Sequence, residues 1–104
     1  MWICFNDAFI SAVQDRSDLS VLVIRGRKRA HLKILFPDYD IIDTPNADYA
    51  CRVFVPKSRF AKLIADRIEE IDYPNFKYSV EDDALHDLYA GFWQDHWRYQ
   101  HRPD

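Results

Sequence analysis

The clearest periodic pattern lies near the C-terminus, where apolar residues recur three and four positions apart. Residues with that spacing share one face of a helix. The pattern predicts a long helix whose inward stripe consists of Leu85, Leu88, Tyr89, Phe92, Trp93, His96 and Trp97. Ser79 and Asp82 have the spacing of a capping box at its start, and Pro103 marks its end. We expect this helix to cover the core.

The N-terminal half is patterned for strands. Trp2 to Val13 predicts one strand or a bent pair of strands, because Asn6-Asp7 interrupts the apolar positions with residues typical of a bulge or turn. A helix over residues 7–13 is the competing interpretation. Three further strands are predicted: a continuous apolar run at 19–25, a short one at 41–44, and an alternating one at 49–55.

Two shorter helices complete the prediction. The first covers Arg27 to Phe36 and stops at Pro37, and the second begins at Pro56 with a stripe at Phe60, Leu63, Ile64, Ile68 and Ile71. Strand, strand, helix therefore occurs twice, over about residues 2–36 and 41–71. We predict a single α+β domain over residues 1–104. Its four-stranded, mainly antiparallel sheet follows the order ββαββα, with an added C-terminal helix. The arrangement is either a circularly permuted ferredoxin-like fold or an antiparallel sheet with helices on one face.

Composition and charge narrow the class of protein. A chain of 104 residues with 48% hydrophobic and 30% charged residues is typical of one globular domain. The net charge of -3 argues against a general nucleic-acid coat, which would be strongly basic. The sequence shows neither a leader pattern nor an apolar run of about 18 residues, so we expect a cytoplasmic protein without a membrane span. Cys4 and Cys51 lie in candidate strands and are predicted to be buried free thiols.

Basic residues gather around the starts of the first two predicted helices. Cations there oppose the helix dipole, yet exposed amides and cations together suit an anion. We therefore predict an anionic or partner-binding edge that consists of Arg25, Arg27, Lys28, Arg29, Arg52, Lys57 and Arg59. Equivalent places in the two halves could bring both helix starts to the same edge of the sheet. The alternative is a solvated face with ordinary ion pairs.

Aromatic residues make up 15% of the chain, more than one small core needs. We expect Phe76, Phe92 and Trp93 to be packed. Tyr78, Trp97 and Tyr99 are candidates for a partly exposed interface, because Tyr and Trp are enriched at the energetic centres of interfaces.

No motif points to catalysis or to a bound cofactor. His86 and His96 lie about 280° apart around a helix at about 100° per residue, so they do not share a face as i, i+4 metal ligands do. Cys4 with Asp7 and a distant histidine is a combination expected by chance. We therefore assign no catalytic residue, metal or cofactor, and an enzyme of unrecognised type stays the weakest alternative.

Several phrases spread over most of the chain resemble a protein family. They are Met1-Trp-Ile, Asn6-Asp-Ala-Phe, Asp48-Tyr with Arg52, Ile71-Asp-Tyr-Pro-Asn-Phe-Lys, and Ala84-Leu-His-Asp-Leu-Tyr with Trp93. The chain resembles a family of small proteins with no assigned activity, found in bacterial genomes and in phage or prophage neighbourhoods. The resemblance implies an accessory protein of a mobile element, such as an inhibitor of a host defence complex.

The sequence thus favours a non-catalytic protein that binds another protein, with a homodimer as one form of that binding. The alternative from another class is a nucleic-acid-binding module that uses the basic helix starts and aromatic stacking.

Overall fold

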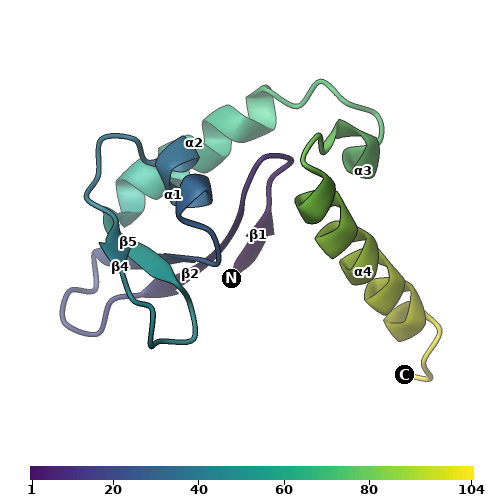
Figure 1. The fold of residues 1–104 in the computed structure, drawn as a ribbon, viewed down its shortest axis with the longest axis horizontal. Helices are drawn as coiled ribbons and strands as arrows, with labels where there is room; N and C mark the ends of the chain where they lie inside the picture. The colour runs from purple at the N-terminus through teal and green to yellow at the C-terminus, as the bar shows by residue number, and fades with distance from the viewer.

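The computed structural model describes residues 1–104, with an open, five-stranded antiparallel sheet at their centre (Figure 1). The strands are β1 (Trp2–Cys4), β2 (Phe9–Gln14), β3 (Val21–Gly26), β4 (Ile42–Asp43) and β5 (Cys51–Pro56), in the spatial order β1-β2-β3-β5-β4. The helices are α1 (Arg29–Leu35), α2 (Lys57–Glu69), α3 (Phe76–Ser79) and α4 (Asp83–Gln100). The α+β class is confirmed.

The prediction of four strands is wrong, because the N-terminal stretch folds into two. Asn6 and Asp7 lie in a tight turn that the Phe5 amide closes by donating to the Ala8 carbonyl at 2.9 Å. β1 and β2 then pair antiparallel, with Trp2 opposite Ser11. The bent pair of strands is therefore the correct interpretation, and the competing helix over 7–13 does not form.

The two strand-strand-helix halves meet where β3 and β5 pair at the middle of the sheet. Their register places Gly26 opposite Cys51 and Val21 opposite Pro56. Each helix follows the C-terminal end of its strand, and antiparallel strands end at opposite sides of a sheet. The start of α1 and the start of α2 therefore lie at opposite ends of the β3–β5 pair.

One face of the sheet carries the larger core beneath α1 and α2. Leu32, Leu35, Phe36, Phe60 and Leu63 pack there against inward strand residues that include Ile10, Ile24, Val53 and Val55. Gly26 allows α1 to come close, because a Cβ atom at this position would lie 3.1 Å from Leu32 Cγ. The helical periodicity of α1 and α2 and the alternation of β5 together account for this layer.

The opposite face carries a smaller core under the first half of α4. Phe9 of β2 is buried there with Val80, Leu85 and Tyr89. Helices thus cover both faces of the sheet (Figure 1), and the alternative of an antiparallel sheet with helices on one face is wrong. The reason is that β2 carries apolar side chains on both faces, so both need cover.

α4 begins later than the predicted capping box. Asp82 is its N-cap and accepts from the Leu85 amide at 2.8 Å. Ser79 instead ends α3, where its hydroxyl donates to the Phe76 carbonyl. Between the two helices, Val80 enters the smaller core, which requires the chain to leave helical geometry. The segment before α4 contains one short helix, α3, which Asn75 caps by accepting from the Tyr78 amide.

Only the first half of α4 packs on the sheet. Leu85 and Tyr89 are buried and Phe92 is partly buried, whereas every residue from Trp93 to Gln100 is exposed. The prediction of a packed Trp93 is wrong, and the predicted stripe ends at Phe92. The exposure expected for Tyr78, Trp97 and Tyr99 is confirmed. The apolar stripe of α4 is longer than the part of the sheet on which the helix packs.

None of the four helices combines the length and the apolar character required to cross a bilayer.

Candidate binding surfaces

The predicted basic residues separate into groups rather than forming one edge. Arg25 and Arg52 lie directly opposite each other on β3 and β5. Lys57 and Arg59 begin α2 at the other end of these strands, roughly 17 Å away at about 3.4 Å per residue. The expectation that both helix starts share one edge is wrong, because it requires parallel rather than antiparallel pairing of the two halves.

The Arg25–Arg52 pair lies on the sheet face opposite α1 and α2. Their strand neighbours Ile24 and Val53 point into the larger core, and side chains alternate between faces along a strand. Arg27, the residue that directly follows β3, joins the pair through Tyr49. The guanidinium carbons of Arg25 and Arg27 lie 4.6 Å and 4.0 Å from the centre of the buried Tyr49 ring. We call Arg25, Arg27 and Arg52, with Tyr49 and Ser11, the arginine cluster.

Negative charge is scarce within the arginine cluster. Arg27 pairs with the exposed Asp48 at 3.4 Å. Arg25 donates only to the hydroxyl of the buried Ser11, at 2.8 Å. The Nε atoms of Arg25 and Arg52 are both buried and have no hydrogen-bond partner. Buried, charged donors without partners cost free energy, and two like charges face each other here.

The other predicted basic residues have ordinary surroundings. Arg29 forms an exposed ion pair with Asp43 at 3.1 Å. Lys57 Nζ donates to the Gln14 side-chain oxygen at 2.9 Å. Lys28 lines a mainly polar hollow of about 830 Å³ between the β1–β2 turn, α1 and the start of α4. Solvated ion pairs of this kind contribute little, so these residues fit the alternative of a plain charged surface.

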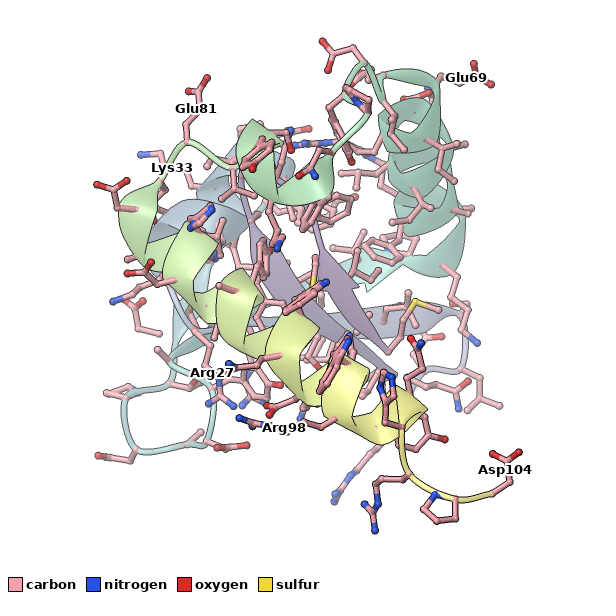
Figure 2. The ribbon with its side chains drawn as sticks, turned by 90° about the vertical axis from the view of Figure 1, so that its right-hand side faces the viewer. Arg27, Lys33, Glu69, Glu81, Arg98 and Asp104 are labelled. Carbon is pink, nitrogen blue, oxygen red and sulfur yellow. The ribbon has the colours of Figure 1, made fainter.

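Four large aromatic side chains of α3 and α4 are exposed, namely Tyr78, Trp93, Trp97 and Tyr99, and we call them together the aromatic surface. Trp93 and Trp97 share a face of α4, whereas Tyr99 lies about 200° around the helix from Trp97. Trp93 is 53% exposed and Trp97 is 50% exposed, although both are large apolar side chains. Lys77 Nζ lies 4.5 Å from the centre of the Trp93 ring, and the Trp97 and His101 rings lie 4.3 Å apart. These contacts orient the rings without covering them. Figure 2 shows α4 crossing in front of the sheet, with Arg98 labelled on its exposed half.

A cleft of about 460 Å³ adjoins the aromatic surface. Its lining combines β1, α3 and α4, and consists of Cys4, Pro74, Asn75, Phe76, Lys77, Tyr89, Phe92, Trp93 and His96. The cleft is apolar at its base and carries a cation at its rim. It suits an apolar side chain of a partner better than a polar metabolite.

Trp2 connects the two surfaces. It stacks on Phe92 of α4 with a centroid distance of 6.4 Å. Across the sheet, Trp2 pairs with Ser11, Ser11 with Arg25, and Arg25 with Arg52. One row of side chains therefore leads from α4 to the unpaired arginines. Sequence reasoning missed Trp2, Ser11 and Tyr49 as members of a site, because only strand register brings these distant positions together.

Tyr89 and the two cysteines serve the structure. The Tyr89 hydroxyl donates to the carbonyls of Phe5 and Ala8, at 2.8 Å and 2.9 Å, and fastens the β1–β2 turn to α4. Burial raises its pKa well above the ordinary value, and the nearby Cys4 and Asp7 act in the same direction. Both thiols are free, as predicted, but Cys4 is exposed and only Cys51 is buried. Partial desolvation by neighbouring atoms raises the pKa of both thiols, even that of the exposed Cys4, which disfavours the reactive thiolate.

The histidines and acidic residues do not converge. No group of three or more His, Cys, Asp or Glu side chains is placed to hold a metal ion. His31 Nδ1 accepts from the Phe9 amide at 3.2 Å, so this histidine joins α1 to β2.

No protein-family model, curated protein or solved structure matches this chain.

Proposed function

We propose that this protein is a non-catalytic module that binds another protein through the aromatic surface. The observation that carries the proposal is the exposure of the whole second half of α4, which includes two tryptophans and a tyrosine. Burying such rings in a core or interface is strongly favourable, so leaving them in water is costly. A partner that covers them would recover that free energy.

The chemistry of the surface supports a partner with an apolar pocket and an acidic rim. Exposed Trp and Tyr act as anchors at the centres of interfaces. Lys77 lies over the Trp93 ring, and a cation at a rim favours encounter with an acidic surface. The family resemblance supports a mobile-element accessory, for which the partner is a component of the bacterial host such as a defence complex.

The experiment begins with a photo-crosslinking amino acid at Trp97, introduced in the native bacterial host. The same group at Lys62, an exposed residue of α2, is the matched control. A partner captured from Trp97 alone is purified, and its affinity is measured by calorimetry. We expect Trp97→Ala to weaken binding by roughly thirtyfold, the loss of one energetic centre of an interface.

Two outcomes would count against the proposal. Unchanged affinity for Trp97→Ala and Trp93→Ala would remove the aromatic surface from recognition. Capture of single-stranded nucleic acid in place of protein would support the alternative class. Capture of a second copy of this chain would instead identify the partner as a homodimer mate, which sedimentation at several concentrations would verify.

A further inference from the structure

We infer that the arginine cluster is a binding site for carboxylates presented by an acidic segment of a protein. The acidic segment belongs to the partner of the proposed function. The inference rests on that function only for the identity of the protein that carries the segment.

The first step is the shortage of acceptors around Arg25 and Arg52. The two guanidinium groups come from directly opposed positions on adjacent strands, where like charges destabilise the sheet. Neither makes an ion pair, and each has a buried Nε atom without a hydrogen-bond partner. The Nη atoms are not buried in this way, and only one of them, on Arg25, has a partner. A bound anion would accept from the free Nη atoms and remove the repulsion.

The second step is the rigidity of the site. Arg25 is oriented by the buried hydroxyl of Ser11 and by the buried ring of Tyr49. Arg27 lies over the same ring and is fixed by donating to the Asp48 carbonyl at 2.6 Å. The donors are thus arranged before a ligand arrives, which reduces the entropy lost on binding. Arg25 and Arg52 extend from paired strands, which hold them more firmly than a loop would.

The third step selects the ligand. The planar fork of a guanidinium suits the two oxygens of a carboxylate, and adjacent forks suit adjacent acidic side chains. A nucleic-acid backbone needs an extended line of cations, whereas Lys57 and Arg59 lie at the far end of the strands and the net charge is -3. A short acidic segment therefore matches the size and charge of the cluster better than a nucleic acid does.

The fourth step is the place of the cluster next to the aromatic surface. The row Trp2, Ser11, Arg25, Arg52 begins at the ring that stacks on Phe92. A partner anchored on α4 can thus extend an acidic segment along this row. Apolar anchoring and charge pairing would occur on neighbouring parts of one face.

The test uses a fluorescent glutamate decapeptide and measures binding by anisotropy at low and moderate salt. The variant Arg25→Gln/Arg52→Gln removes the paired cations. The matched control Lys57→Gln/Arg59→Gln changes the net charge equally at the other end of the sheet. We expect the first variant to bind about tenfold to a hundredfold more weakly, the range for losing charge-assisted hydrogen bonds, and the control to resemble the wild type.

Stability measurements separate a ligand site from a structural role. We expect Arg25→Gln/Arg52→Gln to melt close to the wild-type temperature, because the relief of repulsion between the two cations offsets the loss of the hydrogen bond to the buried Ser11 hydroxyl. The peptide should raise the melting temperature of the wild type and of the control, but not that of the arginine variant. A marked loss of stability in the arginine variant without peptide would assign these arginines to the fold and overturn the inference.

Two further outcomes are decisive. Equal peptide binding by the wild type, the arginine variant and the control would overturn the inference. A single-stranded oligonucleotide that binds more tightly than the peptide, and that requires Arg25 and Arg52, would overturn it as well and identify nucleic acid as the ligand. The variant Trp97→Ala/Tyr99→Ala should keep peptide affinity. If it does while no protein partner requires Trp97, the proposed function fails and the carboxylate site stands.

Discussion

At the scale of single residues, buried polar groups in this protein fall into two kinds. Tyr89 has acceptors that the β1–β2 turn supplies, so its hydrogen bonds stabilise the fold. Arg25 and Arg52 have buried donors that the chain leaves unpaired. Neither kind can be recognised from the sequence, because the sequence does not show which groups will surround a Tyr on a helix or an Arg on a strand. The contrast separates residues that maintain the structure from residues available to a ligand.

The raised pKa of Tyr89 predicts a loss of stability in alkali. The folded state holds the proton above the ordinary value of 10.0, so above that pH the unfolded state binds fewer protons. The stabilisation that the neutral phenol contributes to the folded state is fully present below about pH 10. Above that pH the free energy of unfolding declines by about 1.4 kcal/mol per pH unit for each proton involved. The thiols of Cys4 and Cys51 act in the same direction. Urea unfolding between pH 8 and roughly pH 11 measures the decline.

Tyr89→Phe is the control for this prediction. It should cost about 1 kcal/mol at neutral pH for the lost hydrogen bonds, and its stability should fall less steeply in alkali. Identical alkaline slopes for the variant and the wild type would show that Tyr89 is not the group responsible.

At the scale of elements, α4 divides into a structural half and an exposed half. Its periodic stripe is continuous in sequence, but the sheet beneath it supports only the residues up to Phe92. Asp82 fixes the start, and Arg98 in the last turn complements the helix dipole. Local helix signals therefore continue past the point where tertiary packing stops.

Two leucines on α4 test this division. Leu85 is 4% exposed and Leu88 is 41% exposed, although both belong to the predicted stripe. We expect Leu85→Ala to lower the free energy of unfolding by about 2–5 kcal/mol, the range for a buried leucine. Leu88→Ala should cost less than about 1 kcal/mol. Equal losses in urea unfolding would mean that the helix packs differently on the sheet.

At the scale of the whole molecule, antiparallel pairing at the centre of the sheet decides where charge lies. The two halves place Arg27 at one end of the β3–β5 pair and Lys57 with Arg59 at the other. The same face that carries the arginine cluster also carries α4, so the cations nearest the aromatic surface are not those of α2. The predicted basic residues are therefore divided between the two ends of the β3–β5 pair rather than gathered at a single edge.

This separation predicts that charge reversals act independently. Arg27→Glu should slow association with an acidic partner, and the effect should shrink as salt rises, because steering depends on charge near the interface. Lys57→Glu/Arg59→Glu should leave the association rate almost unchanged. Stopped-flow association at two salt concentrations, with melting curves for each variant, checks the prediction. A larger effect from the α2 pair would place the interface at the opposite end of the sheet.

The sequence by itself determined the elements and their approximate bounds, because periodicity, Gly, Pro and turn residues act over a few neighbouring positions. It indicated the strands, the three longer helices and the exposure of Trp97 and Tyr99. It left open whether residues 2–13 form one strand or two. Only the tertiary structure decided the fifth strand, the cover on both faces and the pairing of Arg25 with Arg52. Those features depend on strand register and on the face of the sheet against which each helix packs. Both are set by contacts between residues far apart in the chain.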